Sequence, residues 1–195
     1  MNKKGVSKKV ICWIILISVL IILIVVLAFG LLSNKKDDTV QEYNSGVITM
    51  SYTDSNVFKF TNLVPLTDSL GKTSDQYFDF VVNTKLEDSD EIDYEIAVSI
   101  IEDESNVTGD YVKFYLEKQN SGSFSKVFGP SIFEGLATAS KLSTPAGSMV
   151  LLEDTKKKDS TDNYRLRVFL DEKSIVSTDV VYYVSVKVDV FGKDK

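Results

Sequence analysis

The stretch Ile92-Asp93-Tyr94-Glu95-Ile96-Ala97-Val98-Ser99-Ile100-Ile101 decides the fold class of this chain. Apolar residues occupy every second position, and the positions between them are polar or small. Successive side chains of a β-strand point to opposite faces, so this alternation predicts a strand with one face on a core and the other toward solvent. The inward set is Ile92, Tyr94, Ile96, Val98 and Ile100, and the outward set is Asp93, Glu95, Ala97 and Ser99.

Seven further runs of this kind follow or precede it, separated by turn-forming residues and without a sustained helical period. About eight strands without intervening helices predict an all-β fold, an antiparallel β-sandwich of jelly-roll or Ig-like type. A partly closed barrel is the alternative. Between Gly122 and Gly147 the pattern is less regular. There we expect Phe128, Ile132, Phe133 and Leu136 to cover one end of the core from a loop or a helical turn. The seven runs are Val47–Tyr52, Val57–Leu63, Gln76–Asn83, Tyr111–Glu117, Met149–Glu153, Tyr164–Leu170 and Val180–Phe191.

Upstream of the sandwich, residues 10–32 form an uncharged run in which 18 of 23 residues are Val, Ile, Leu or Phe. A helix of this length is about 35 Å long, enough to cross a bilayer core of about 30 Å. Four lysines in residues 1–9 precede the run, against Lys35 and Lys36 just after it. Because the flank richer in lysine usually stays cytoplasmic, we expect a cytoplasmic basic tail (1–9) and a single-pass signal-anchor (10–32).

Two other interpretations of this segment remain open. Ala28-Phe29-Gly30 has small residues at a spacing that signal peptidase accepts, although the apolar run exceeds the roughly 7–15 residues of most signal peptides. Cys12 is not preceded by a lipobox, so we interpret it as a membrane-embedded thiol, with palmitoylation as the alternative. After the span we expect a flexible polar stalk (33–46) and an extracytoplasmic domain (47–195), which places the protein in the cell membrane.

Composition excludes several classes of function. Beyond residue 32 the chain carries 18 basic and 28 acidic residues, a net charge of −10, which disfavours nucleic acid as a partner. The chain contains no histidine, so Ser-His-Asp catalysis and HExxH zinc sites cannot form. Its one cysteine lies in the predicted span, so the outer domain has no disulfide. A cysteine-poor, lysine- and isoleucine-rich chain is typical of exported proteins of low-GC Gram-positive bacteria.

Three polar segments are candidates for chemistry. Glu87–Asp93 and Glu102–Asn106 offer oxygen atoms to calcium but lack the EF-hand glycine and its terminal glutamate, so solvated turns are the favoured interpretation. Lys156–Asn163 is predicted to be a solvated hairpin loop. Paired carboxylates for glycoside cleavage carry no weight without geometry. We assign no catalytic, metal or cofactor residue and expect no cofactor.

Aromatic and cationic side chains give two further candidates. Tyr111, Tyr115 and Tyr183 are predicted to lie on outward strand faces, either to stack on a ligand or, as the favoured alternative, to cover a sheet as cross-strand pairs. Arg165 and Arg167 are the only arginines in the chain and share the face opposite Leu166. They are suited to clamping an anion, but we expect them to pair with acids on neighbouring strands.

Three segments resemble a known family. They are Phe58-Lys59-Phe60-Thr61-Asn62-Leu63-Val64-Pro65-Leu66-Thr67-Asp68, Tyr77-Phe78-Asp79-Phe80-Val81-Val82-Asn83-Thr84 and Ile92-Asp93-Tyr94-Glu95-Ile96. The pattern, over about residues 47–101, resembles the TasA/camelysin family of exported bacterial β-sandwich matrix proteins. The family tends toward Pro-Gly-Asp where this chain has Pro65-Leu66-Thr67-Asp68. The resemblance implies a surface sandwich with an assembly or adhesive role, and it identifies no functional residue.

Taken together, these features predict a membrane-tethered cell-surface β-sandwich with a structural, adhesive or matrix-assembly role and no enzymatic activity. Its expected partners are the membrane and either a surface protein or further copies of itself. A ligand-binding or sensory ectodomain for a glycan or an envelope peptide is the alternative. A third possibility is an enzyme that uses carboxylates. Long open edge strands would favour the first function, and a recess lined by tyrosine and acidic residues would favour the second and the third.

Overall fold

We describe the fold from a computed structural model. The described residues are 39–43, 46–52, 56–86, 90–133, 142, 144–174, 177 and 179–194. The predicted tail (1–9), signal-anchor (10–32) and Cys12 lie outside these residues. Within them, no helix has the length and apolar character needed to cross a membrane. The chain divides into two compact units, Met1–Asp37 and Asp38–Lys195, and all the elements described below belong to the second.

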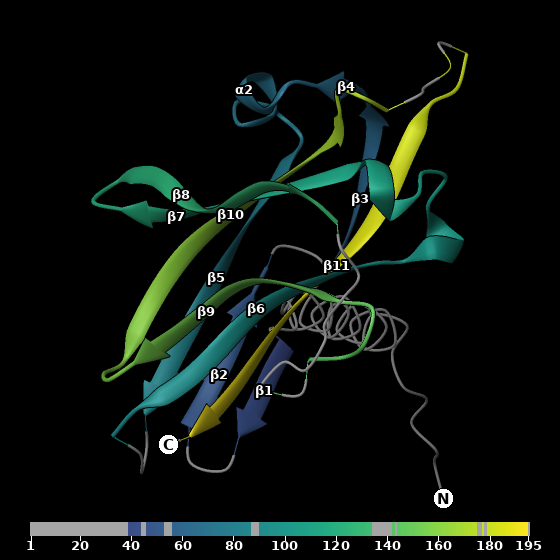
Figure 1. The fold of residues 1–195 in the computed structure, drawn as a ribbon. Coiled ribbons are helices and arrows are strands. Elements are labelled where there is room, and N and C mark those ends of the chain that lie inside the picture. The colour runs from purple at the N-terminus through teal and green to yellow at the C-terminus, as the bar shows by residue number, and fades with distance from the viewer. Residues whose placement is uncertain are drawn as a thin grey trace, which may run out of the picture. The chain divides into compact units, whose positions relative to one another are not determined.

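Strands are the main secondary structure among the described residues of the second unit (Figure 1). One four-residue α-helix and two 3₁₀ turns lie in the connections. In chain order the elements are β1 (Thr39–Tyr43), β2 (Gly46–Ser51), β3 (Val57–Leu63), β4 (Pro65–Leu66), α2 (Asp68–Gly71), β5 (Tyr77–Leu86), β6 (Ile92–Ile100), η1 (Glu102–Glu104), η2 (Gly109–Tyr111), β7 (Val112–Asn120), β8 (Ser123–Ile132), β9 (Met149–Lys156), β10 (Ser160–Asp171) and β11 (Tyr182–Asp194).

The strands form two sheets. The larger has the order β1-β2-β5-β10-β7-β8, and the smaller has the order β3-β11-β6-β9. Neighbouring strands are antiparallel, apart from the two-residue β4, which pairs parallel with the end of β10. The predicted all-β antiparallel sandwich is therefore confirmed.

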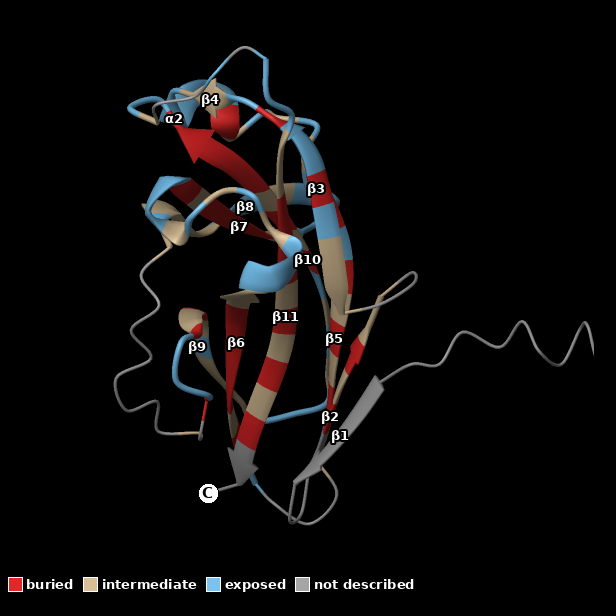
Figure 2. Cartoon of the chain, turned by 90° about the vertical axis from the view of Figure 1, so that its right-hand side faces the viewer, coloured by how far each residue is buried: buried red, intermediate tan, exposed pale blue. Residues whose placement is uncertain are grey.

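The core lies between the two sheets, and buried and exposed residues alternate along the strands (Figure 2). Aromatic rings join the sheets near β3 and β5: the rings of Phe58 and Phe78 stack with centroids 3.5 Å apart. On the outer side of β10, Phe169 is covered by α2, because a Cβ on Gly71 would come within 2.2 Å of its ring. Only glycine fits there, and this contact holds α2 against the larger sheet.

All eight predicted runs are strands, but two connections were predicted wrongly. Thr39–Tyr43, in the predicted flexible stalk, forms β1 and pairs with β2 from Thr39↔Met50 to Tyr43↔Gly46. Ser123–Ile132, where a loop or helical turn was expected, forms β8. Ser121 and Gly122 both have positive φ, the geometry of a tight hairpin turn that returns the chain alongside β7.

The predicted faces of β6 are half right. Ile92, Tyr94, Ile96 and Val98 are buried as expected, and Ile100 is half-buried. On the other face, however, Glu95 and Ala97 are each only 1% exposed, so the prediction that they face solvent is wrong. The chain just before β9 lies over this face, where the Thr144 hydroxyl donates a 2.7 Å hydrogen bond to the Glu95 carboxylate.

Candidate functional site

The acidic segments do not gather into one site. In the first, residues 87–89 lie outside the described part, Asp90 is exposed, and Glu91 pairs with Lys157 at 3.2 Å. In the second, η1 places three acidic side chains in solvent at Glu102–Glu104. Among the described residues, no group of three or more acidic, histidine or cysteine side chains is arranged to hold a metal ion.

The end of the second segment has a structural use. The Asn106 side chain accepts a hydrogen bond from the Tyr183 backbone N–H and donates one to the Val181 carbonyl. The Ser105 hydroxyl likewise accepts from the Ser185 N–H and donates to the Ile101 carbonyl. Together these bonds fasten the β6–β7 connection to β11. Beside it lies a recess of about 440 Å³ whose lining includes the apolar residues Ile100, Val107 and Phe133.

The two arginines lie on the outer face of the larger sheet and pair with acids, as expected. Arg165 contacts both oxygens of Asp79 on β5, at 2.7 and 2.8 Å, and Arg167 contacts Glu117 on β7 at 2.9 Å. The Arg165 guanidinium also lies 3.9 Å from the centre of the Tyr77 ring and 4.3 Å from that of Phe124. Phe124 is on β8, so this stack ties the edge hairpin to the middle of the sheet.

The three candidate tyrosines do not form one platform. Tyr183 belongs to the smaller sheet and lies under the Lys59 ammonium at 4.3 Å, whereas Tyr111 and Tyr115 precede or lie on β7 in the larger one. Tyr111 is 37% exposed. Tyr115 lies on the outer face as predicted, opposite Arg167 on β10, but it is only 7% exposed, which agrees with the favoured role of covering the sheet and leaves little surface for a ligand. Burial raises the pKa of the Tyr115 hydroxyl.

A recess of about 290 Å³ opens on the outer face of β6 and β9, which sequence patterns did not indicate. The register places Glu95 directly opposite Glu153, and next to them Asp93 accepts a short hydrogen bond from Thr155. Like charges directly opposite each other destabilise a sheet, so this end of the smaller sheet is electrostatically suited to a cationic group. Leu142, Tyr94 and Asp154 complete the lining.

The most distinctive polar feature lies inside the sandwich. Tyr94 on β6 and Tyr164 on β10 face each other across the two sheets, with their hydroxyl oxygens 2.8 Å apart. Both residues are almost fully buried. The Tyr94 hydroxyl also donates to Asp154 Oδ2 at 3.2 Å. A hydrogen bond between the two layers therefore joins strands that belong to different sheets.

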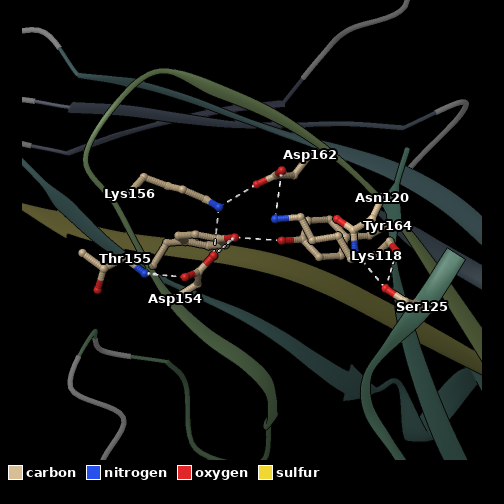
Figure 3. Close-up of polar contacts among 9 residues, drawn as sticks. Lys118, Asn120, Ser125, Asp154, Thr155, Lys156, Asp162 and Tyr164 are labelled. Carbon is tan, nitrogen blue, oxygen red and sulfur yellow. Dashed lines mark hydrogen bonds and ion pairs between the residues drawn. The ribbon is translucent and has the colours of Figure 1, made fainter. Parts of the chain in front are cut away.

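Four charged residues surround this tyrosine pair, and we call them the interior ion cluster: Lys118, Asp154, Lys156 and Asp162 (Figure 3). Lys156 Nζ lies 2.9 Å from a carboxylate oxygen of both Asp154 and Asp162. Lys118 Nζ lies 2.9 Å from the other oxygen of Asp162. The predicted solvated loop Lys156–Asn163 is confirmed for the exposed residues 157–159 only, since Lys156 ends β9 and β10 begins at Ser160.

Burial and hydrogen bonds fix the protonation states of this cluster near neutral pH. Burial raises the pKa values of Asp154 and Asp162, but hydrogen bonds from the lysines outweigh it and leave both below their usual range. Burial raises the pKa of the Tyr94 hydroxyl and that of Tyr164, the latter to about 12. Two cations balance two anions, and both tyrosines stay protonated. The arrangement joins the sheets and provides no poised acid or base.

The two sheets end in strands with different chemistry. β8 closes one side of the larger sheet with two register irregularities, exposed Lys126, and Pro130, which has no N–H to donate. β3 closes one side of the smaller sheet. It pairs with β11 alone among the described residues, contains no proline, and exposes Lys59, Thr61 and Asn62. β3 therefore differs from β8 chiefly in having no proline, since it also exposes a lysine and has one register irregularity in its pairing with β11.

No family model matches this chain, and a search of the curated proteins finds no match either.

Proposed function

We propose that this protein is a single-pass, membrane-tethered surface protein, not an enzyme, whose sandwich assembles laterally with other chains. The observation that carries the proposal is the position of β3, a seven-residue strand without proline that ends the smaller sheet and pairs with β11 alone among the described strands. An edge of this kind binds an extended segment by strand addition. The resemblance to the TasA/camelysin family of matrix proteins supports the same role, and the apolar run at residues 10–32 supports the tether.

A ligand-binding ectodomain is the second candidate. The acidic recess on β6 and β9 favours it, because Asp93 and Glu153 line an opening of about 290 Å³. The charge of the recess favours a cationic envelope peptide over a neutral glycan.

We expect the full-length protein to stay in the membrane fraction after washing with alkaline carbonate, and residues 33–195 to be digested by protease added outside intact cells. A span of 23 uncharged residues is long enough for stable insertion, and the lysine bias places the amino terminus inside. Immunoblots against both ends of the chain give the measurement. A soluble form that begins just after residue 30 would show a cleaved signal peptide instead.

Strand pairing at β3 is testable with cysteines, because Cys12 is the only natural one and can be replaced by serine. In the Cys12→Ser background, Thr61→Cys should give a disulfide-linked dimer or a mixed disulfide with a cysteine-substituted partner under mild oxidation in native membranes. Ser123→Cys, equally exposed at the start of β8, is the matched control. Equal cross-linking of the two variants would contradict assembly through β3.

A further inference from the structure

The smaller sheet ends in β3 on one side and in β9 on the other. β3 is antiparallel to β11, β11 to β6, and β6 to β9, so β3 and β9 run in opposite directions. When a second copy lies beside the first in the same orientation, its β9 is therefore antiparallel to β3 of the first copy. Such a contact joins two different edges, so it can be repeated from copy to copy.

The direction of the backbone groups along β3 follows from one hydrogen bond. The Val188 N–H donates to the Asn56 carbonyl at 2.9 Å, so these opposite residues form a hydrogen-bonded pair. Such pairs alternate along an antiparallel ladder, so Phe58 and Phe60 also bond to β11. The N–H and C=O groups of Lys59 then point away from β11, toward the side where no described strand pairs with β3.

The same reasoning gives the direction of the backbone groups along β9. The Ile101 N–H donates to the Ser185 carbonyl at 2.9 Å, so the odd-numbered residues of β11 bond to β6. Continuing the alternation across β6, Asp154 bonds to β6, and the backbone groups of Glu153 point away from it. A separate bond agrees with this assignment, because the Thr155 N–H, on the same side as that of Glu153, donates to the Asp154 carboxylate at 2.8 Å.

Lys59 and Glu153 carry opposite charges at these two edges. Both side chains are exposed and lie on the outer face of the smaller sheet. The Lys59 ammonium lies over the Tyr183 ring, and among the described residues neither Lys59 nor Glu153 has a partner of opposite charge. Glu153 lies opposite Glu95 and near Asp93, so the edge of β9 attracts a cation.

The same lysine disfavours the pairing of β3 with β3 of a second copy. Two antiparallel edges form hydrogen-bonded pairs only between residues whose backbone groups point outward. In β3, Lys59 lies midway between Val57 and Thr61, whose backbone groups point the same way. The two-fold register that uses all three residues places Lys59 opposite Lys59 of the other copy, and like charges directly opposite each other destabilise a sheet.

We propose that copies of this protein assemble head to tail, with β3 of one copy added to β9 of the next and Lys59 opposite Glu153. The inference rests on the proposed lateral assembly through β3 and names its partner and register. In this register Phe60 lies opposite Leu152 on the inner face, so the apolar inner faces of the two sheets become continuous. The smaller sheet is then extended by four strands with each added copy.

Cysteine cross-linking of the full-length protein in native membranes tests the register. In the Cys12→Ser background, one chain carries both Lys59→Cys and Glu153→Cys. Opposite residues of a hydrogen-bonded pair have Cα atoms about 5.5 Å apart, within the range of about 4.4–6.8 Å that disulfides bridge. Mild oxidation should therefore give a ladder of dimers, trimers and longer multimers on non-reducing gels. The matched control, Lys59→Cys with Ser123→Cys on exposed β8, should give no ladder.

Charge reversal tests the contact between Lys59 and Glu153. Full-length protein in detergent micelles is sedimented over a range of concentrations, and the midpoint concentration of assembly is compared between variants. Lys59→Glu and Glu153→Lys should each raise this midpoint by about tenfold, because each replaces an attraction with a repulsion. The double variant should return to within about threefold of wild type, since it restores the pair with the signs exchanged. Lys126→Glu makes the same charge change as Lys59→Glu on exposed β8 and should shift the midpoint by less than about threefold.

The outcomes separate this inference from the proposed function. A double reversal that assembles no better than the single variants would show that Lys59 does not face Glu153. If Thr61→Cys cross-links β3 but the chain with Lys59→Cys and Glu153→Cys forms no ladder, lateral assembly through β3 stands and β9 is the wrong partner. Cross-linked dimers from Lys59→Cys alone would identify β3 of a second copy as the partner instead. If Thr61→Cys cross-links no more than Ser123→Cys, the proposed assembly fails and the inference fails with it.

Discussion

Replacing Ile96 with aspartate will leave the domain largely unfolded at room temperature. Ile96 is fully buried in the middle of β6, between Val190 on β11 and Leu152 on β9. The change removes the packing of a core isoleucine, which costs about 2–5 kcal/mol, and it also buries a carboxylate without a partner. Since domains of this size are stable by about 5–15 kcal/mol, the loss consumes most of the folding free energy.

The measurement is urea unfolding of residues 38–195, which form one compact unit, followed by far-UV circular dichroism. Ile132→Asp is the matched control, because Ile132 is 36% exposed at the end of β8 and its aspartate can reach water. We expect the control to lose no more than about 1 kcal/mol. Similar unfolding curves for the two variants would show that β6 does not lie at the centre of the core.

Asp162→Ala will have the second largest effect, a loss of about 2–3 kcal/mol. Asp162 is the carboxylate shared by Lys118 and Lys156, so its removal leaves two partly buried ammonium groups short of a partner. Breaking a buried pair costs about 3–5 kcal/mol, and we reduce this figure because the three side chains retain 15–20% exposure. Asp79→Ala removes an ion pair on the outer face, with Arg165, and should cost at most about 1 kcal/mol.

The pH dependence of stability distinguishes the loss of these ion pairs in Asp162→Ala from a simple loss of packing. The folded state lowers the pKa values of Asp154 and Asp162, so the unfolded chain binds protons more readily. The stability they contribute is complete above the ordinary carboxyl pKa of about 4 and is lost as the pH falls through the lower, folded values. Urea unfolding at pH 7 and in steps below pH 4 should show the gap between wild type and Asp162→Ala narrowing. A gap that stays constant with pH would mean that packing, not charge, explains the loss.

The sequence predicted the strands because period-two alternation is a local signal. The prediction that Glu95 faces solvent failed because a segment distant in sequence covers that face of β6. Nothing near Glu95 in the sequence indicates that Thr144 will lie over it. The hairpin to β8 was missed because Ser121-Gly122 is a weaker turn signal than Asn-Gly.

Among the candidate residues, the ion pairs of the two arginines were predicted correctly. The reason is that side chains opposite each other on adjacent strands lie close enough to form an ion pair. The alternation of side chains along β7 and β10 indicates that two members of the interior ion cluster point inward, although no such cluster was predicted. Lys118 continues the alternation of Phe114 and Leu116, and Asp162 continues that of Tyr164 and Leu166, so both charged side chains point inward. The two-residue alternation alone could not decide whether Lys118 and Asp162 end their strands in solvent or lie buried as charged groups. Burial requires oppositely charged groups from the other sheet, and the alternation within one strand does not show these.

The direction of β1 has a mechanical consequence. From Thr39 the strand runs toward the end of the sandwich that carries the β9–β10 connection, since Tyr43 pairs with Gly46 and Gly46 with Leu86. A force that pulls Thr39 toward that end breaks the five residue pairs between β1 and β2 one after another, starting with Thr39 and Met50. Each backbone hydrogen bond that breaks contributes only about 1 kcal/mol. Under tension β1 gives way before the sheets do. Its release adds about 16 Å of extended chain before Gly46 and leaves the rest of the sandwich folded.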